Sequence, residues 1–479
     1  MKRKWLAIGI STVSVVLLIL ASFSNVVGYQ SVKSTIHPDS PLSTITISER
    51  HFQSDLSYPS VEWDRVYGEQ SSHSYSVCED SDGDSVVTGS VHNDIVLIKT
   101  DTNGNLVWNR SFDSGLNDVG CCVRQTIDGG YIVTGIVDSY HNMFTYAHVG
   151  LLKYDHQGNL LWNRSMKFGG YSDGIDILQT NDQGFLIAGS TSIQSSGLLV
   201  KTDAMGYIQW YRMFGSEKYD CGISLAYAAD GGYDILVRSA TYYGANASFW
   251  FLHTDENGSE LWNRTIPTKD KWICSMNPTD DGGYILAGDR YYPKLIPSDA
   301  WMLKLNASGY EEWNKSYGGS FYHDRGSSVC QTPDGGYVLT GFTGTTTGYE
   351  PYTLWVVKTD ENGNEQWNRS IPSNLSGYGF DIICSSDGMF IITGNHDSKI
   401  WILKLANEPP QKQRMVFLFG SITYLETEGV FVTFQAQNIC LVQLLPLKIT
   451  HYKDNEYVSI SENYTGIIRP KFIVGLSYV

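Results

Sequence analysis

The chain has 479 residues, more than a single compact core usually organises, so several domains or a repeat architecture are expected. Its 47 glycines, 13% aromatic residues and only 18% charged residues are typical of short strands joined by tight turns and argue against a mainly helical protein. The 34 Lys and Arg against 50 Asp and Glu give a net charge of -16, and a basic run occurs only at the extreme N-terminus. We therefore expect no nucleic-acid partner.

The N-terminus has the pattern of an export signal. Met1-Lys-Arg-Lys is followed by an apolar stretch to about Phe23 and by small and polar residues through Gly28. The stretch is long enough to span a bilayer if it is not removed, so residues 1–28 are either a signal peptide or an N-terminal membrane anchor. In both cases we expect an exported protein that is extracellular or on the cell surface. Residues 29–60, rich in Ser, Thr and Pro, are predicted to be a flexible spacer.

Three markers then recur seven times each. The first is a tryptophan, usually within W-N-R-S, at Trp63, Trp108, Trp162, Trp210, Trp262, Trp313 and Trp367. The second is an Asp-Gly turn that starts at Asp82, Asp128, Asp182, Asp230, Asp281, Asp334 and Asp387. The third is a basic strand end, at Lys99, Lys153, Lys201, His253, Lys304, Lys358 and Lys404.

The segments between the markers are short and are either rich in β-branched residues or continuously apolar. They predict four strands per repeat and an all-β fold. The first of these is a tryptophan strand, Val61 to Tyr67, and the last is an apolar strand, Lys399 to Leu405. The repeats after the first strand make six complete four-stranded blades and a seventh with only three strands. The N-terminal strand can supply the missing outer strand of the seventh blade. Residues 61–407 are therefore predicted to form a seven-bladed β-propeller closed by pairing of its two ends.

The run K-x-D-x-x-G-x-x-x-W, as in Lys358 to Trp367, resembles the tryptophan-docking motif of quinoprotein propellers, and the whole unit resembles repeats of secreted archaeal and bacterial propellers. The resemblance implies tryptophans packed flat between neighbouring blades, each indole N–H finding a backbone carbonyl. It implies no activity, because one fold hosts many functions. Residues 408–414 are predicted to be a linker, and residues 415–479 a small C-terminal β module.

Several patterns suggest chemistry, and each has a simpler structural interpretation. Gly170-Tyr171-Ser172-Asp173-Gly174 matches G-x-S-x-G, but no helix is expected after the serine. Asp80-Ser-Asp82-Gly-Asp84 offers several oxygens but lacks the glutamate of a calcium loop, so we expect a turn and no metal. In most copies the Lys marker is expected to pair with the Asp two residues later, for example Asp101 or Asp203.

The cysteines also have two interpretations. The adjacent Cys121 and Cys122 resemble the vicinal pair on which some quinoprotein dehydrogenases stack their quinone, but one buried and one outward thiol is the expected arrangement, and no cofactor is expected. Cys78, Cys330 and Cys384 fall at nearly the same place in their repeats, which indicates small buried residues on inner strands.

The sequon Asn-x-Ser/Thr occurs ten times, and five copies lie in the tryptophan marker, opposite Trp on an outer strand. These possible glycosylation sites are Asn109, Asn163, Asn263, Asn314 and Asn368.

The connections between strands differ on the two sides of the predicted ring. The Asp-Gly and D-x-x-G turns share one side, and the connections on the other side vary and are rich in aromatic residues. These candidate binding residues are Tyr140, Tyr146, Tyr171, Tyr219, Tyr242, Tyr243, Trp272, Tyr291, Tyr292, Tyr322, His323 and Tyr349, with Tyr352 and Tyr378 nearby. Aromatic faces beside acidic and amide groups suit sugars, although tyrosines also cover blade ends.

These observations favour a cell-surface binding or scaffold protein whose variable loops engage a glycan or a protein partner. The first alternative is an exported quinone- or metal-dependent enzyme with its site at the propeller channel. The second is a purely structural surface-layer component that assembles through the C-terminal module.

Overall fold

The computed structural model describes residues 43–46, 59–139, 146–215, 219–240, 248–266, 268, 271–291, 298–319, 322–345, 352–372, 376–406, 419–425, 429–435, 447–453, 456–462 and 472–475. The chain divides into two compact units, one of Tyr58–Pro409 and one of Met1–Ser57 together with Pro410–Val479.

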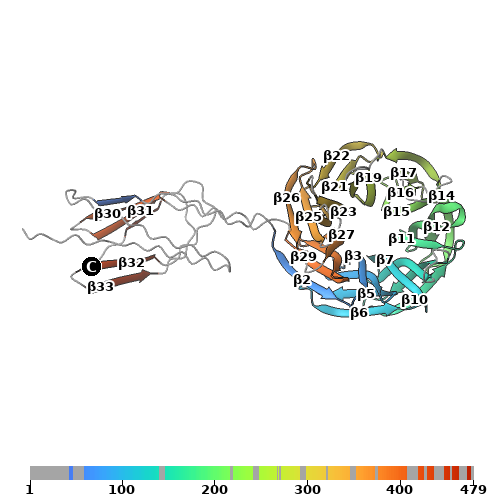
Figure 1. The fold of residues 1–479 in the computed structure, drawn as a ribbon, viewed down its shortest axis with the longest axis horizontal. Coiled ribbons are helices and arrows are strands. Elements are labelled where there is room, and N and C mark those ends of the chain that lie inside the picture. The colour runs from blue at the N-terminus through green and yellow to red at the C-terminus, as the bar shows by residue number, and fades with distance from the viewer. Residues whose placement is uncertain are drawn as a thin grey trace, which may run out of the picture. The chain divides into compact units, whose positions relative to one another are not determined.

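The larger unit consists of seven four-stranded antiparallel sheets arranged in a ring as the blades of a β-propeller (Figure 1). Blade 1 comprises β3 (Ser72–Glu79), β4 (Ser85–Val91), β5 (Asp94–Thr100) and β6 (Leu106–Phe112). Blade 2 comprises β7 (Asn117–Gln125), β8 (Tyr131–Ser139), β9 (His148–Tyr154) and β10 (Leu160–Met166). Blade 3 comprises β11 (Ser172–Gln179), β12 (Phe185–Thr191), the 3-10 turn η1 (Ile193–Ser195), β13 (Ser196–Thr202) and β14 (Ile208–Phe214).

The remaining blades repeat this order from the inner to the outer strand. Blade 4 comprises β15 (Tyr219–Tyr227), β16 (Tyr233–Ala240), β17 (Ser248–Thr254) and β18 (Glu260–Ile266). Blade 5 comprises β19 (Lys271–Pro278), β20 (Tyr284–Tyr291), β21 (Ser298–Leu305) and β22 (Glu311–Tyr317). Blade 6 comprises β23 (Tyr322–Gln331), β24 (Tyr337–Thr345), β25 (Thr353–Thr359) and β26 (Glu365–Ile371). Blade 7 comprises β27 (Gly377–Cys384), β28 (Phe390–His396), β29 (Lys399–Leu405) and, from the other end of the ring, β2 (Val61–Tyr67).

The ring closes as the sequence predicts. β2 pairs antiparallel with β29, with Trp63 opposite Lys404, and the Ala406 amide donates to the Ser60 carbonyl at 3.0 Å. The first and last strands of the repeat region therefore share one blade, which leaves no open edge between blades 7 and 1. The predicted seven-bladed all-β fold is confirmed.

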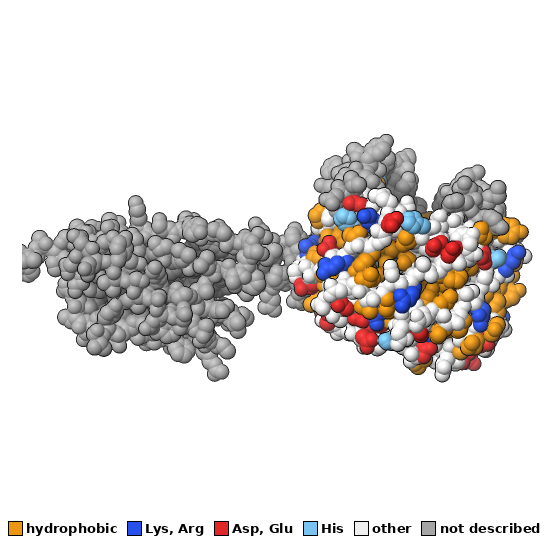
Figure 2. Space-filling model, turned by 90° about the horizontal axis from the view of Figure 1, so that it is seen from below, with side chains coloured by type: hydrophobic (Ala, Val, Ile, Leu, Met, Phe, Trp, Pro, Cys, Tyr) orange, Lys and Arg blue, Asp and Glu red, His pale blue; other side chains and the backbone are white. Residues whose placement is uncertain are grey.

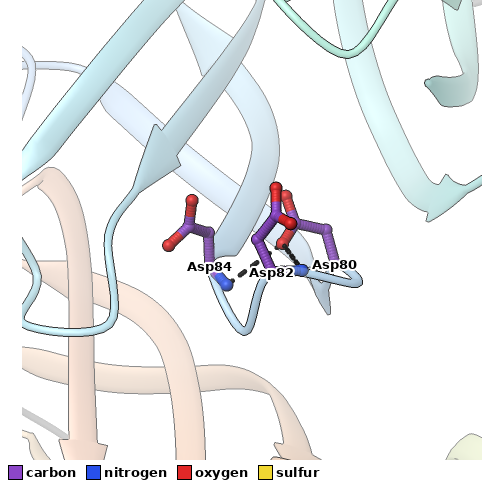
Figure 3. A group of neighbouring side chains, drawn as sticks. All are labelled: Asp80, Asp82 and Asp84. Carbon is purple, nitrogen blue, oxygen red and sulfur yellow. Dashed lines mark hydrogen bonds between the residues drawn. The ribbon is translucent and has the colours of Figure 1, made fainter. Parts of the chain in front are cut away.

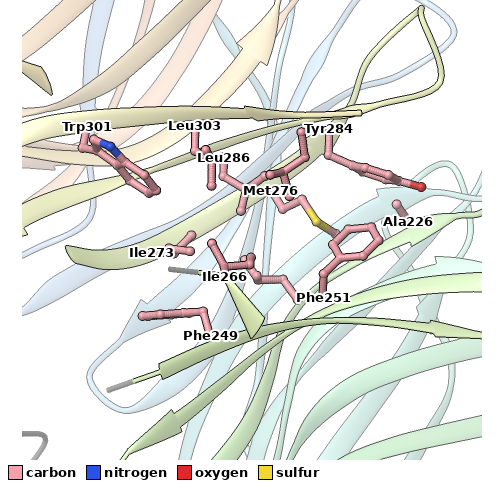
Figure 4. Close-up of a cluster of buried hydrophobic side chains, with 12 residues drawn as sticks. Ala226, Phe249, Phe251, Ile266, Ile273, Met276, Tyr284, Leu286, Trp301 and Leu303 are labelled. Carbon is pink, nitrogen blue, oxygen red and sulfur yellow. The ribbon is translucent and has the colours of Figure 1, made fainter. Parts of the chain in front are cut away.

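The hydrophobic core lies between neighbouring blades. Figure 4 shows one cluster, in which Phe249 and Phe251 of β17 pack with Met276 of β19 and Trp301 of β21. The third strand of each blade is apolar on both faces because each face meets another blade, which explains its continuous apolar sequence.

The marker tryptophans pack on the D-x-x-G turn of the next blade. Gly363 has φ +72°, and a Cβ on it would lie 2.7 Å from the Trp313 ring. The same contact joins Gly104 to Trp63, Gly158 to Trp108, Gly206 to Trp162 and Gly258 to Trp210. The Trp63 indole N–H donates to the Thr102 carbonyl at 2.9 Å. An Arg two residues after the marker Trp lies over that Trp, as at Arg110, 5.3 Å from the Trp108 ring centre, and at Arg164, Arg212 and Arg264. The resemblance of these repeats to those of quinoprotein propellers stays a prediction.

The marker lysines are buried, and the prediction of their ion-pair partners was wrong. Lys201 Nζ lies 2.7 Å from Asp182, the aspartate of the Asp-Gly turn, and also donates to the Thr202 carbonyl and to Gln209. Asp203, the expected partner, instead accepts the amides of its own turn, at Met205 and Tyr207. The lysine side chain reaches the neighbouring turn because two strands of one blade end there side by side.

The smaller unit is also built of strands. β1 (Ser43–Thr46), β30 (Phe419–Leu425), β31 (Gly429–Gln435) and β34 (Phe472–Gly475) form one sheet, and β32 (Leu447–Lys453) pairs with β33 (Glu456–Glu462). β1 lies within residues 29–60, for which no strand was expected, and pairs with β30. In the described part of the chain no helix has the length and apolarity needed to cross a membrane, and residues 1–28 lie outside that part.

Candidate functional site

The innermost strand of every blade contains a β-bulge at an equivalent place. One residue there is skipped in the pairing with the second strand, and a bulge of this kind redirects the skipped side chain. The skipped residues are Tyr75, Cys121, Ile175, Ile223, Cys274, Ser327 and Phe380. Because the innermost strands surround the axis of the ring (Figure 1), these positions form a circle around it.

Blades 6, 7 and 1 contribute aromatic side chains at this level. The Tyr378 and Phe380 rings are nearly parallel, at 6°, with centres 6.1 Å apart, and Phe380 is also 6.1 Å from Tyr75. Phe342 and Tyr352 pack against Tyr378 at 5.0 and 5.4 Å. Tyr75 is the most exposed of them, at 40%, and His73 lies 6.5 Å from it. We call His73, Tyr75, Phe342, Tyr352, Tyr378 and Phe380 the inner-strand aromatic cluster.

Blades 3 to 6 contribute charged side chains, of which Arg325 contacts the cluster. Arg325 lies 5.7 Å from the Phe342 ring centre and 3.3 Å from the buried Asp289. Arg238, in blade 4, lies 4.9 Å from the ring centre of Trp272, in blade 5. Asp173, in blade 3, accepts hydrogen bonds from Ser190 and from the Tyr171 hydroxyl. We call Asp173, Arg238, Asp289 and Arg325 the polar arc.

Burial shifts the carboxyl groups of the polar arc toward their neutral form. Burial raises the pKa of Asp173, and the hydrogen bonds from Ser190 and Tyr171 only partly oppose it. Burial likewise raises the pKa of Asp289 in spite of the Arg325 guanidinium. Each carboxyl group therefore binds its proton more tightly than in water, and a protonated carboxyl can donate as well as accept a hydrogen bond.

Residues just after the bulges join each blade to its neighbours. The Val77 amide donates to Asp381 between blades 1 and 7, at 3.0 Å, and Ser328 donates to the same carboxylate between blades 6 and 7, at 2.8 Å. Asp176 receives the Cys122 thiol from blade 2 and the Leu225 amide from blade 4. The other three junctions are joined by Val123 N to Ser76, Ser224 to the Met276 carbonyl, and Asn277 to the Val329 carbonyl. This belt holds the inner strands, and with them the aromatic cluster, in fixed positions.

The predicted loop residues are only partly covered by the structure. Tyr140, Tyr242, Tyr243, Tyr292 and Tyr349 lie outside the described residues. Tyr219, Tyr291 and Tyr322 lie in strands β15, β20 and β23. Tyr146 is 49% exposed beneath the Lys167 ammonium, and His323 is half-buried. Tyr171 and Trp272 contact the polar arc.

The patterns that suggested an active site have other structures. Ser172 is fully buried at the start of β11, its hydroxyl donates to the Ala147 carbonyl, and a strand follows it, so it is not on a nucleophile elbow. Cys122 is buried and donates to Asp176, whereas Cys121 is half-buried at the bulge, so the two thiols differ in surroundings. Burial raises the pKa of Cys121 to about 12, which keeps the thiol protonated.

Asp80, Asp82 and Asp84 are the one group of three close ligand side chains among the described residues. Asp80 accepts the amides of Asp82 and Asp84 at 3.0 and 3.1 Å, which forms the turn (Figure 3). The Lys99 ammonium lies 2.7 Å from Asp80 and 3.1 Å from Asp84, and the Tyr131 hydroxyl of blade 2 also donates to Asp80. The Lys99 ammonium thus occupies the position between these carboxylates where a metal cation would bind.

The outer strands carry the predicted glycosylation sites. Asn109, Asn163, Asn263 and Asn314 are exposed, whereas Asn368 is half-buried and accepts the Trp355 indole N–H. Figure 2 views the rim where β6 and β10 lie and shows charges of both signs among hydrophobic side chains. Exposed Leu106, Val107, Leu160 and Leu161 contribute to this apolar surface.

Cys78, Cys330 and Cys384 lie at nearly the same place on their inner strands, as predicted. Cys78 and Cys330 each lie three residues after the bulge residue of their strand, whereas Cys384 lies four residues after the bulge residue of β27. Cys78 is buried, and Cys330 and Cys384 are half-buried.

No protein-family model matches this chain, and no curated protein matches its sequence. Among solved structures it is similar to a catalytically inactive virginiamycin B lyase from Staphylococcus aureus with quinupristin, at 13% identity and a TM-score of 0.47, over 72% of this chain and 98% of that one. It is also similar to Drosophila Plexin A in complex with Semaphorin 1b, at 6% identity and a TM-score of 0.44, over 73% and 87%. A third is BBS1N in complex with ARL6DN, at 9% identity and a TM-score of 0.44, over 74% and 98%. At these identities and TM-scores the likeness carries no conclusion about function.

Sequence reasoning missed most of the inner-strand aromatic cluster. It considered aromatic residues in the variable connections, whereas Tyr75, Phe342 and Phe380 lie inside strands. A signal was present, because most repeats have a small residue, then a variable one, then a small polar one, as in Gly379-Phe380-Asp381 and Ser74-Tyr75-Ser76. The variable middle position is the bulge residue.

Proposed function

We propose that this protein is an exported binding protein that engages a neutral glycan at the inner-strand aromatic cluster of its propeller. The observation that carries the proposal is the group of adjoining aromatic rings from blades 6, 7 and 1, with Tyr75 40% exposed. Export rests on the N-terminal pattern.

Sugar rings suit such a cluster. The C–H face of a pyranose packs on an aromatic ring, and its hydroxyl groups need donors and acceptors at the ring edge. Tyr75 and Phe380 supply adjoining faces from two blades. Because the belt of hydrogen bonds fixes both inner strands, little conformational entropy is lost when a ligand binds.

The polar arc favours a neutral sugar over an acidic one. Its two arginines are accompanied by two buried carboxyl groups, and Arg325 is paired with Asp289. The positive charge is therefore balanced locally, and an anionic ligand would gain little.

A glycan array probed with the full chain tests this proposal. We expect binding to neutral oligosaccharides, a roughly tenfold or greater loss of affinity in Tyr75→Ala and Phe380→Ala, and near-normal affinity in Tyr75→Phe, which keeps the ring. The control is Tyr207→Ala, because Tyr207 is 60% exposed and lies in a D-x-x-G turn on the opposite side of the ring.

Equal losses in Tyr75→Ala and Tyr207→Ala would contradict the assignment of the site. Binding to no glycan, with a protein partner captured through the same residues, would replace the glycan by a protein ligand. Circular dichroism and thermal unfolding of each variant establish that the fold is intact.

A further inference from the structure

Neighbouring blades contact each other in a repeated way at the end of the inner strand. A Gln or Glu in the last position of the strand accepts the backbone amide of the residue before the turn aspartate in the preceding blade. The contacts are Ser81 N to Gln125, Ile127 N to Gln179, Asp280 N to Gln331 and Ser386 N to Glu79, at 2.7 to 2.9 Å. They join blades 1 to 2, 2 to 3, 5 to 6 and 7 to 1.

The junction between blades 6 and 7 cannot make this contact. The residue before the turn aspartate of blade 6 is Pro333, which has no N–H to donate. The last position of the inner strand of blade 7 is Cys384 instead of Gln or Glu. Both partners of the repeated hydrogen bond are therefore changed at the same junction.

A pair of sulfur atoms lies at this junction instead. Cys384 Sγ is 2.8 Å from Cys330 Sγ, on the inner strand of blade 6, and 3.0 Å from the Gln331 carbonyl oxygen. The separation is too short for two thiols that merely pack together. The buried Cys122, by contrast, donates its thiol hydrogen to Asp176.

We infer that Cys330 and Cys384 form a disulfide bond that joins the inner strands of blades 6 and 7. Each thiol loses one proton, and the two sulfurs together give up two electrons to a disulfide-containing oxidant, which is reduced to its dithiol as the new S–S bond forms. An exported chain meets oxidants of this class.

The bond has a clear structural consequence. Blade 7 is completed by β2 from the far end of the repeat region, so only three of its strands follow one another in the chain. A covalent link from β27 to β23 fixes them to blade 6. Burial raises the pKa of the Cys330 thiol in the closed ring, so the exchange reaction proceeds most readily before the two blades are packed.

Tryptic peptide mapping of the full chain tests this inference directly. The protein is produced in an oxidising compartment, purified without reductant, denatured and alkylated with iodoacetamide. Trypsin leaves Cys330 in peptide 326–358 and Cys384 in peptide 370–399, with one cysteine in each. We expect these two peptides to be linked and to separate on reduction, whereas peptide 111–124, with Cys121 and Cys122, is alkylated twice.

Full alkylation of peptides 326–358 and 370–399, even after the folded protein has been incubated with oxidised glutathione, would overturn the inference. A second measurement uses Cys384→Ser. Reductant should lower the melting temperature of the natural chain by several degrees and leave that of Cys384→Ser unchanged. If Cys384→Ser does not fold, the peptide map of the natural chain decides alone.

Discussion

The contact between each marker tryptophan and the turn glycine of the next blade can be tested with a matched pair of substitutions. Gly363 and Gly388 both have positive φ, +72° and +79°, and both close four-residue turns by donating their amide to a carbonyl three residues earlier. A Cβ on Gly363 would lie 2.7 Å from the Trp313 ring, whereas a Cβ on Gly388 would meet nothing within 4 Å. The two sites share this turn geometry and differ mainly at the tryptophan contact, while Gly363 is in addition buried and its carbonyl accepts the Tyr317 hydroxyl.

The expected magnitudes follow from this difference. Gly388→Ala bears only the cost of a left-handed backbone, about 1–2 kcal/mol. Gly363→Ala adds the cost of overpacking against a buried ring, about 1–3 kcal/mol, for a total of about 2–5 kcal/mol. In a Trp313→Ala background the additional cost should vanish, so that Gly363→Ala there costs no more than Gly388→Ala.

Denaturant unfolding, followed by far-UV circular dichroism, measures these differences. Equal destabilisation by Gly363→Ala and Gly388→Ala, or a cost of Gly363→Ala that is the same with and without Trp313, would show that the tryptophan does not pack on the next blade as described.

Three further predictions concern the buried ion pairs and the rim. Burial opposes ionisation of Asp182, but hydrogen bonds from Lys201 and Thr180 outweigh it and lower its pKa from 3.8 to about 2. This stabilisation is complete above about pH 4 and is lost as pH falls toward 2, so the unfolding free energy of Asp182→Asn should change less than that of the natural chain between those values; identical acid profiles would contradict the pairing. Lys358→Met should cost about 2–3 kcal/mol in urea unfolding, because Lys358 is 1% exposed and its ammonium has four oxygen partners; a neutral result would show that these bonds add nothing. In glycopeptide mapping, occupancy should be higher at exposed Asn109 than at half-buried Asn368, and the reverse order would contradict it.

The propeller could be predicted because its determinants are repeated in the sequence. Tryptophan, the Asp-Gly turn and the apolar strand each recur seven times, and the unmatched strands at the two ends imply closure, which the pairing of β2 with β29 confirms. Strand β1 was not expected, because its four residues stand alone and its partner β30 lies at the other end of the chain.

The candidate site could be predicted only in part, because it depends on contacts between residues distant in sequence. Tyr75 and Phe380 lie in the first and last blades, and only ring closure brings them together. The ion-pair partner of Lys201 was likewise predicted from local spacing. In the fold its ammonium lies beside Asp182, in the turn that precedes the neighbouring strand β12.

Hydrogen–deuterium exchange of the full chain, with and without a neutral oligosaccharide that it binds on an array, tests whether the ligand lies on the inner-strand aromatic cluster. We expect increased protection in peptides that cover β3 (Ser72–Glu79) and β27 (Gly377–Cys384), and loss of this protection in Tyr75→Ala. Protection confined to the D-x-x-G turns or to strands β30 to β34, with β3 and β27 unchanged, would contradict it.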